Sequence, residues 1–591
     1  MSAVVDAALP ATTGGDFLLR EPGERLIFTP ERFSELHREM YEATVAFGEA
    51  ELLPEDEAIE TGDTEVSHRL LVKSCEAGLA SVEVPEEFGG LDLDKVTALL
   101  VTEGLSCQAS FATTFGAHAS IGMLPIVYFG SEAIKQRYLP GLCAGEITSC
   151  YALTEPGSGS DALAARTTAV LDADGSHYVL NGTKQFITNA AIADICVVFA
   201  KVDGSKFSGF VVDLKAEGVI IGAPEHKMGI RGSNTCAITL DNVRVPADHL
   251  LGEIGKGHKI AFNILNLGRM KLAAGSLGGA KSSLAMAVEY ALERKQFGTE
   301  IASFGAIRQK FAAVATSIFA AESIIYRAGG CVDEALEGLH DASPLVQFKA
   351  IEEFATEAAM CKVVGSEALG HATDEAVQVH GGYGFTEEYK AERAYRDARI
   401  NRIYEGTNEI NRMLVPGTLL KRAFQGRLDL MGAAGEITRD IEDASYEPPA
   451  FVGCLAHERT LLHLMKRRTL YTLNATFMKL QRELTKRQDL LMPLADMIIA
   501  LYNSDSAVAR ALQTPEDTSL SLMARIVVRQ SWDQVDQLAR RVVWNVSGSR
   551  GKAVHLENLS RWSVTPEADL LGLEQELGAL VVEHKGYPVA F

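Results

Sequence analysis

Glu405 is the residue whose type and surroundings most clearly allow acid–base chemistry. It lies in the segment Ile403-Tyr404-Glu405-Gly406, where a partly apolar setting can raise the pKa of the carboxyl group toward neutrality. A carboxylate with such a pKa is suited to remove a proton from a substrate near pH 7. Gly406 has no side chain, so a ligand can lie close to the backbone there. Taken alone, the segment equally fits a glutamate in an ordinary glycine-containing turn before a helix.

A second segment with binding potential is YALTEPGSGSD (151–161), which crowds turn residues after an apolar stretch. Its exposed backbone N–H groups, together with the hydroxyls of Thr154 and Ser160, can hydrogen-bond a polar ligand. The alternative interpretation is a plain hairpin loop without a ligand.

Two later segments contain residues that suit a diphosphate. Arg294 in RKQFG (294–298) can bind a diphosphate through two parallel hydrogen bonds. Gly381 and Gly382 in QVHGGYGF (378–385) allow a backbone to approach a phosphate or a base closely. The alternative for Arg294 is a cation at the end of a helix that faces solvent.

Several common signatures are missing or incomplete. The glycines of 252–257 lack the spacing of a phosphate loop, and those of 157–160 lack the third glycine of a dinucleotide fingerprint. No GxSxG, HExxH or CxxC motif occurs. These observations weigh against an NTPase, a Rossmann dehydrogenase, an α/β-hydrolase and a zinc protease, and no metal site is predicted.

Composition restricts the partners and the compartment. The formal net charge is −22, so the body of the protein is a poor general binder of nucleic acid. The nine cysteines are scattered, which favours free thiols in a reducing compartment. The first 25 residues are acidic and lack an apolar block, and no run of about 18 uninterrupted apolar residues appears. We therefore expect a cytoplasmic protein without a transmembrane helix.

The pattern along the chain predicts a mainly helical protein with a central β-domain. Helical periodicity over 30–150 follows Thr29 and Pro30, a plausible helix start. Short β-branched runs separated by turns, among them the hairpin-type turn DADG, predict an antiparallel β-domain over 151–250. Helical periodicity returns over 251–420 and again over 421–591. The segment 436–451, with its two prolines, is predicted to be a linker. Composition alone equally allows unrelated helical domains with a small β insert.

The C-terminal region contains an unusually basic stretch, 461–491. An apolar stripe at helical spacing runs through it, and seven cations accompany the stripe: Lys466, Arg467, Arg468, Lys479, Arg482, Lys486 and Arg487. A basic amphipathic helix can lie on a membrane surface. The interpretation that we favour is that the stripe packs on its own domain or on a partner subunit.

Four segments follow one another around a small β-domain between helical domains: 151–161, 294–298, 378–385 and RIYEGTNEI (402–410). In this order they resemble the acyl-CoA dehydrogenase family of flavoproteins. The resemblance extends over roughly 30–420 and is closest to the very-long-chain branch, whose members carry an extra helical C-terminal domain. Over 421–591 it rests on length and helical character. The implied fold is a helical domain, a β-barrel-like domain, a helical-bundle domain and a C-terminal helical extension.

The resemblance implies an FAD-dependent oxidation of long-chain acyl-CoA to trans-2-enoyl-CoA in fatty-acid β-oxidation. Glu405 would remove the α-proton, and a hydride would pass from the β-carbon to flavin N5. The backbone N–H of Glu405 and a ribityl hydroxyl of the flavin would hold the thioester carbonyl.

Many site residues follow from the same resemblance. Those implied to bind the cofactor are Tyr151, Leu153, Thr154, Gly159, Ser160, Phe186, Ile187, Thr188, Arg294, Gln296, Phe297, Gln378, Gly381, Gly382, Thr407 and Asn408. Those implied to bind the substrate are Ser160, Asn266, Arg269 and Gly406; Arg269 equally fits a packing role. Phe186 stands where many relatives have tryptophan, so this position lacks the indole N–H donor of tryptophan. Gly116 and Gly122 could leave the floor of an acyl channel open, and His118 between them is assigned no chemistry.

In this family FAD lies across a subunit boundary, so the resemblance implies at least a homodimer. It also implies electron-transferring flavoprotein as the electron acceptor. Two alternatives stay open. One is an acyl-CoA oxidase that passes electrons to O₂, and the other is a non-catalytic assembly or scaffold protein on the same fold.

Overall fold

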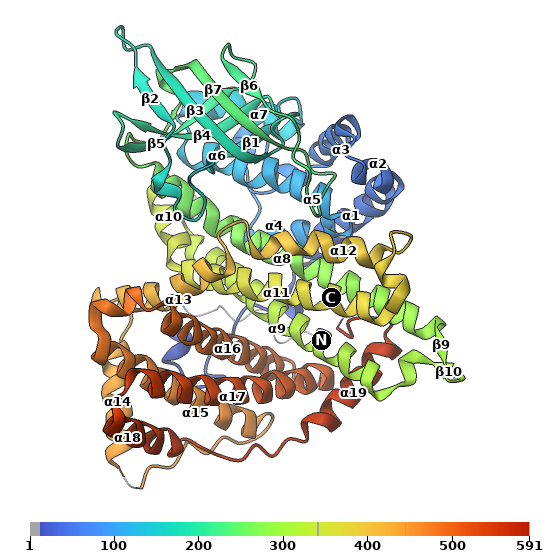
Figure 1. Cartoon of the computed structure of the whole chain (residues 1–591), viewed down its shortest axis with the longest axis vertical. Coiled ribbons are helices and arrows are strands. Elements are labelled where there is room, and N and C mark those ends of the chain that lie inside the picture. Colours follow the sequence, from blue (N-terminus) through green and yellow to red (C-terminus); the bar gives the residue numbers. More distant parts are fainter. Residues whose placement is uncertain (1–11, 340–341, 444, 590–591) are drawn as a thin grey trace.

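The computed structural model describes residues 12–339, 342–443 and 445–589. Residues 1–11, which belong to the N-terminal segment that argued against a leader peptide, lie outside this part. The chain forms a β-domain, helices that cover it, a layer of long helices below and a C-terminal helical domain (Figure 1). The prediction of a mainly helical chain with a central β-domain is confirmed.

The N-terminal domain is helical throughout. Its helices are α1 (Glu35–Phe47), α2 (Asp56–Glu60), α3 (Thr64–Glu76), α4 (Lys95–Gly104), α5 (Ala109–Gly116), α6 (Leu124–Phe129) and α7 (Glu132–Ala144). Thr29 is the N-cap and Pro30 the first residue of a helix, as expected, but this helix is a 3₁₀ helix of three residues (Pro30–Arg32) without a side-chain cap hydrogen bond. The long helix begins at Glu35, where Ser34 and His37 form a reciprocal capping box.

The β-domain is one eight-stranded sheet. Its strands are β1 (Ser149–Ala152), β2 (Thr168–Leu171), β3 (His177–Thr188), β4 (Ile195–Val202), β5 (Lys206–Asp213), β6 (Val219–Ile221), β7 (Thr235–Pro246) and β8 (Leu250–Leu251). The main path runs β6-β7-β3-β2-β4-β5-β8, with β1 beside β4. DADG forms the β2–β3 turn, as predicted. The expectation of a purely antiparallel sheet is wrong, since β4 pairs in parallel with both β1 and β2. The β2–β3 and β4–β5 hairpins meet through β2 and β4, which run in the same direction.

Long helices form the middle layer in Figure 1. They are α8 (Gly257–Glu293), α9 (Gly305–Leu336), α10 (Pro344–Glu353), α11 (Ala355–His380), α12 (Lys390–Ala398) and α13 (Asn408–Phe424). A small hairpin, β9 (Lys295–Gln296) and β10 (Thr299–Glu300), projects from the end of α8. The helices α8 and α11 approach each other closely at Gly365. A Cβ on this residue would lie only 2.9 Å from the Cα of Ala273.

Among the described residues, α9 is the helix that is long and apolar enough to cross a membrane by composition. However, 89% of its most apolar window is buried inside the protein. Helices of the C-terminal domain cover it, as Figure 1 shows for α16 and α19. A core helix passes the same test of composition, so this result by itself does not indicate a membrane span.

The C-terminal domain consists of α14 (Leu430–Glu442), α15 (Ala456–Leu480), α16 (Gln488–Gln513), α17 (Thr518–Val546), α18 (Ser549–Ser560) and α19 (Leu570–Glu583). The predicted linker 436–451 is wrong in its first half, because 436–442 form the end of α14. Ile437 is buried there, and this packing holds the acidic segment in a helix.

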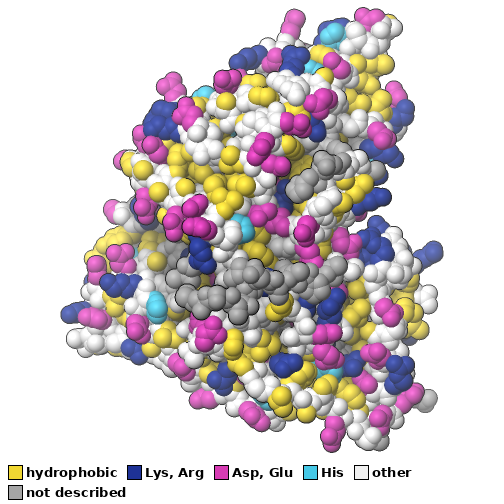
Figure 2. Space-filling model, turned by 180° about the vertical axis from the view of Figure 1, so that it is seen from behind, with side chains coloured by type: hydrophobic (Ala, Val, Ile, Leu, Met, Phe, Trp, Pro, Cys, Tyr) yellow, Lys and Arg dark blue, Asp and Glu magenta, His cyan; other side chains and the backbone are white. Residues whose placement is uncertain are grey.

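The basic stretch 461–491 packs largely inside this domain. Lys466 and Arg468 are buried and form ion pairs with Asp505 and Asp536. The apolar stripe is buried or lies against the core. These contacts support the packing interpretation. Membrane contact stays a prediction and would rest on the cations near the surface: Lys479, Arg482, Lys486 and Arg487. On the face drawn in Figure 2, acidic and basic side chains are intermixed.

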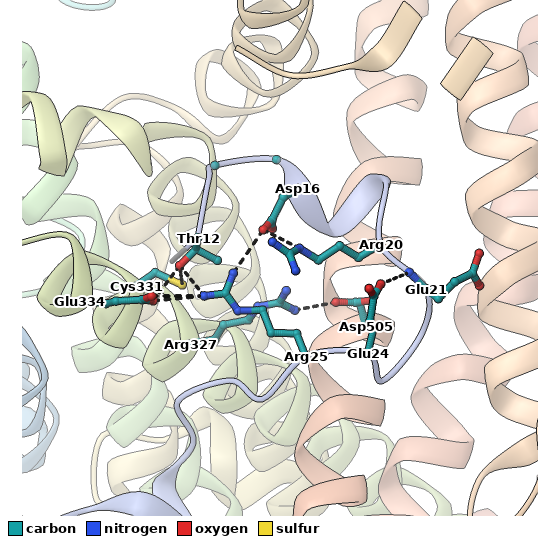
Figure 3. A network of polar contacts seen from close by, with 12 residues as sticks. Thr12, Asp16, Arg20, Glu21, Glu24, Arg25, Arg327, Cys331, Glu334 and Asp505 are labelled. Carbon is teal, nitrogen blue, oxygen red and sulfur yellow. Dashed lines mark hydrogen bonds and ion pairs between the residues drawn. The ribbon is translucent and has the colours of Figure 1, made fainter. Parts of the chain in front are cut away.

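The segment 12–27 fastens the C-terminal domain to the core (Figure 3). Arg25 contacts Asp16 and reaches Glu334 of α9. The backbone carbonyl of Arg20 accepts a hydrogen bond from Lys466 of α15. The N-terminal segment therefore bridges α9 and the C-terminal helices through charged groups.

Candidate active site

Glu405 lies in a strained turn directly before α13. Its φ is 55° and that of Gly406 is 81°, and a left-handed conformation is uncommon for a residue other than glycine. Thr407 then caps α13 by accepting the N–H of Ile410. The Asn411 side chain donates to the carbonyl of Gly406 at 2.8 Å. The surrounding contacts therefore hold the glutamate in a conformation that it would rarely adopt alone, as is frequent at functional sites.

Two cations flank this turn. Arg269 on α8 donates from Nε to the carbonyl oxygen of Glu405 at 3.2 Å and from Nη1 to Asn266 at 2.9 Å. Lys362 on α11 donates to the side-chain oxygen of Asn408 at 2.7 Å. The turn is thus fixed by one charged side chain from each of the two longest helices of the site.

Burial raises the pKa of the Glu405 carboxyl group to about 7, while the charges of Arg269 and Lys362 act in the opposite direction. The Oε2 atom of Glu405 is buried and has no hydrogen-bond partner within the described residues. A buried carboxylate without a partner is costly. A general base near pH 7 needs a pKa close to neutrality and an atom that is free to accept a proton. The Glu405 carboxyl group has both.

Glu405 forms part of the wall of a cavity of about 530 Å³ that extends along α8. Its wall on α8 contains three glycines, Gly268, Gly275 and Gly279, beside larger residues such as Leu272 and Met286. A Cβ on Gly268 would lie 3.0 Å from Oε2 of Glu405, so glycine makes room for the carboxylate. Apolar side chains such as Leu272 and Phe115 line other parts of the cavity.

The two glycines expected to leave a channel floor open, Gly116 and Gly122, differ in their surroundings. Gly116 lines the cavity, and a Cβ on it would have no atom within 4 Å. A Cβ on Gly122 would lie 2.5 Å from the Ser149 hydroxyl, so Gly122 serves close packing. His118 is buried, and its ring nitrogens bond to Leu142 and Ser149, which is a structural role.

The residues predicted from the β-domain differ in their burial and in their relation to the cavity. Thr188 lines it. The Tyr151 hydroxyl is buried and without a partner in the described part of the chain, and burial together with the Glu405 charge holds its pKa well above the usual value. Phe186 is 62% exposed in a left-handed conformation. Ile187 is buried; Leu153 and Thr154 are partly buried; Gly159 and Ser160 are exposed.

The predicted residues at the C-terminal ends of α8 and α11 do not meet Glu405 within one chain. Arg294, Gln296, Phe297, Gln378, Gly381 and Gly382 are exposed. They form one surface patch, in which Arg294 lies 5.7 Å from the Tyr383 ring. Arg294 follows Gly268 by 26 residues, which corresponds to about 39 Å along a helix. The chain therefore carries two separate groups of predicted ligand-binding residues.

Three further predicted residues, Asn266, Arg269 and Asn408, lie near the Glu405 turn but do not line the cavity. Asn266 and Arg269 are buried and outside the lining of the cavity. Asn408 is buried and bonded to Lys362 and Ser366. These contacts give the three residues a positioning role, and their assignment to substrate or cofactor binding stays a prediction.

Sequence reasoning missed three features of the site. Lys362 carries no motif, and its role depends on a contact with Asn408. Glu155 locks the 151–161 loop by contacting Lys184 at 2.8 Å and Thr167. The recurrence of glycine at 268, 275 and 279, which places these residues on one helical face, was the available signal for the channel.

Family models match four regions of the chain. Those described as the N-terminal, middle and C-terminal domains of acyl-CoA dehydrogenase match 34–146, 150–243 and 255–420. A further model, also described as an acyl-CoA dehydrogenase C-terminal domain, matches 464–561.

Similar proteins and structures agree with these matches. A Bacillus subtilis protein named "Probable acyl-CoA dehydrogenase" is 42% identical, with 98% of each chain covered. The bovine mitochondrial very long-chain specific acyl-CoA dehydrogenase is 35% identical, over 77% of this chain and 72% of its own. A crystal structure of an acyl-CoA dehydrogenase complexed with FAD, from Bacillus anthracis, has a TM-score of 0.96 and 41% identity, and covers 98% of this chain and 100% of its own.

Proposed function

Because the chain belongs to the acyl-CoA dehydrogenase family, we propose that it binds FAD and oxidises long-chain acyl-CoA thioesters to trans-2-enoyl-CoA, as a step of fatty-acid β-oxidation. One observation carries this proposal. The buried and orphaned carboxylate of Glu405, with a pKa of about 7, lies in the wall of a long, largely apolar cavity.

In this proposal Glu405 is the general base that removes the α-proton of the acyl group. Its ionised form is supported by Arg269 and Lys362, and its position is held through its own carbonyl and through Asn408. We expect the backbone N–H of Glu405 to hold the thioester carbonyl. Bound FAD supplies the acceptor for the β-hydride.

The exposed patch at the end of α8 fits the diphosphate part of FAD. A Cβ on Gly381 or Gly382 would have no atom within 4 Å, so the backbone there is open to a ligand. Arg294 is exposed and shows no ion pair within the described residues, which leaves its guanidinium available for a phosphate.

The Arg294 patch lies about 39 Å along α8 from Gly268, which contacts Glu405, and this separation of the two groups of residues supports a homodimer. One FAD molecule cannot span both groups of a single chain. A second copy would bring its own Arg294 patch to the FAD held near Glu405, and each site would be complete only in the pair.

The shape of the cavity supports a long acyl chain. Its lining runs along α8 from Gly268 to Glu289, a distance of about 30 Å for 21 residues. The exposed Phe186 ring, beside the proposed flavin position, offers an apolar contact to a protein electron acceptor. We therefore include electron-transferring flavoprotein as the acceptor.

The experiment is an anaerobic titration of the purified yellow protein with acyl-CoA thioesters of increasing length, followed by flavin absorbance. Bleaching that is strongest with long chains is expected. Admission of air then tests the acceptor, since slow reoxidation is expected of a dehydrogenase and rapid reoxidation of an oxidase. A flavin that no acyl-CoA bleaches would contradict the proposal.

A further inference from the structure

The Glu405 turn is linked to the C-terminal domain by a charged contact between α13 and α16. Arg412 lies on α13, seven residues after Glu405, and donates from Nε to Asp496 of α16 at 2.6 Å. The two helices pack against each other (Figure 1), and the Arg412 side chain is only 18% exposed. The C-terminal domain therefore contacts the helix that begins at the proposed base.

The same guanidinium binds a second carboxylate, on α11. Nη1 and Nη2 of Arg412 donate to the two oxygens of Glu367, at 2.7 and 3.0 Å. Two parallel bonds of this kind fix the orientation of both groups. Glu367 also accepts the side-chain N–H of Asn408 at 3.1 Å. A continuous chain of hydrogen bonds thus runs from α16 to a residue three positions after Glu405.

This chain ends beside the ammonium group of Lys362, which donates to Asn408 at 2.7 Å. Burial lowers the pKa of Lys362 to about 8. Three negative charges act in the opposite direction: Glu405, Glu367 and Glu409. The ammonium therefore lies within the field of three carboxylates, and its position depends on how far each of them is neutralised by other groups.

The charges around Lys362 differ in strength. Glu409 is exposed, so solvent screens its charge. Arg269 lies on the other flank of the Glu405 turn, and its positive charge repels the ammonium. Glu367 is therefore the main competitor of Glu405 for this cation. Its own pairing with a guanidinium reduces that competition.

We propose that Asp496 and Arg412 are positioning residues for the reaction, so that the C-terminal domain contributes to catalysis as well as to packing. Asp496 fixes the guanidinium, and the guanidinium neutralises Glu367. The ammonium of Lys362 then stays at the Glu405 turn, where it supports the ionised base. This inference rests on the proposed function and assigns a part of it to the C-terminal domain.

The test is the pH profile of anaerobic flavin reduction by a long-chain acyl-CoA, measured on the full chain. In Arg412→Met, the unpaired Glu367 should attract Lys362, and the rise in rate should move to higher pH by about half a unit or more. Below the midpoint this shift corresponds to a rate about threefold lower. Asp496→Asn removes the anchor of the guanidinium and should shift the profile in the same direction by less.

The double variant R412M/E367Q separates this role from a structural one. With no carboxylate at position 367 to compete for Lys362, the profile should return toward that of the wild type although Arg412 is still absent. Asp505→Asn is the matched control. It makes the same substitution on α16 and weakens a buried contact of the C-terminal domain with Arg327, at 2.8 Å. It should lower the melting temperature and leave the pH profile unchanged.

Unshifted profiles in both R412M and D496N would overturn the inference, as would a shift in R412M that E367Q does not reverse. A shift in D505N as large as that in D496N would also overturn it, because general loosening of the domain would then explain both. If R412M does not fold, the comparison of D496N with D505N decides. A wild-type flavin that no acyl-CoA bleaches would instead refute the proposed function, a result distinct from any shift between variants.

Discussion

The Nζ atom of Lys362 lies 2.7 Å from the side-chain oxygen of Asn408, three residues after Glu405. Together with the bond from Arg269 to the Glu405 carbonyl, this contact ties the turn of the proposed base to both α11 and α8. The two cations support the charged form of a carboxylate whose burial favours the neutral form.

Replacing Lys362 by methionine should therefore raise the pKa of Glu405 further, by about one unit or more. Since the base must be ionised, the rate of flavin reduction should rise with pH through about 7 in the wild type. In K362M this rise should move to higher pH. The measurement is the pH profile of anaerobic flavin reduction, with Lys362→Arg as the charged control. An unshifted profile in K362M would limit Lys362 to packing.

Substitution at Gly116 should narrow the acyl channel without disturbing the fold, because a side chain there meets open space. Gly116→Leu is expected to lower kcat/KM for long acyl chains by about tenfold or more, with short chains much less affected. Gly122→Ala is the matched contrast. Its Cβ collides with Ser149, so it should lower the melting temperature instead. If G116L lowered kcat/KM equally for acyl chains of all lengths, or not at all, the acyl chain would not lie beside Gly116.

Arg294→Ala should weaken retention of FAD, because the proposed diphosphate contact is removed. The flavin-to-protein ratio after extended dialysis measures this. Lys295→Ala removes the neighbouring exposed cation and should leave the ratio unchanged. A flavin content of R294A equal to that of K295A would make Arg294 an ordinary surface cation.

The docking of the C-terminal domain depends on Arg510. This buried side chain pairs with Glu31 at 2.7 Å and with Glu322 at 2.6 Å. Arg510→Met leaves Glu31 without this cation and leaves the buried Glu322 with Lys281 as its remaining cation, and should cost about 3–5 kcal/mol of unfolding free energy, as measured by chemical denaturation. Arg487→Met, which breaks an exposed pair with Asp489, should leave the unfolding free energy nearly unchanged, because solvent screens such a pair. Similar costs for both variants would contradict the role of Arg510 as a buried anchor.

The sequence predicted what depends on local pattern and motif. The turn around Glu405, the β2–β3 turn and the helical periodicity all lie within short segments, and the structure shows them. Features that depend on contacts between residues far apart in the chain could not be predicted from the sequence. Asp505 and Asp536, which neutralise Lys466 and Arg468, are far from them in the chain, so the sequence favoured packing of the basic stretch but left contact with a membrane surface open as an alternative. Likewise the parallel pairing of β4 with β1 and β2 depends on how two hairpins meet.

The central claim is that Glu405 removes the α-proton. Glu405→Gln keeps the shape of the side chain but cannot accept a proton, while the contacts of its backbone with Arg269 and Asn411 remain. The variant should fold and bind FAD, and its stability should equal or exceed that of the wild type, because a buried carboxylate has been removed.

The direct measurement is the rate at which a long-chain acyl-CoA bleaches the flavin of E405Q under anaerobic conditions. A loss of about 10²–10⁴-fold relative to the wild type is expected, with acyl-CoA binding retained. Bleaching within a few-fold of the wild-type rate would show that another group is the base.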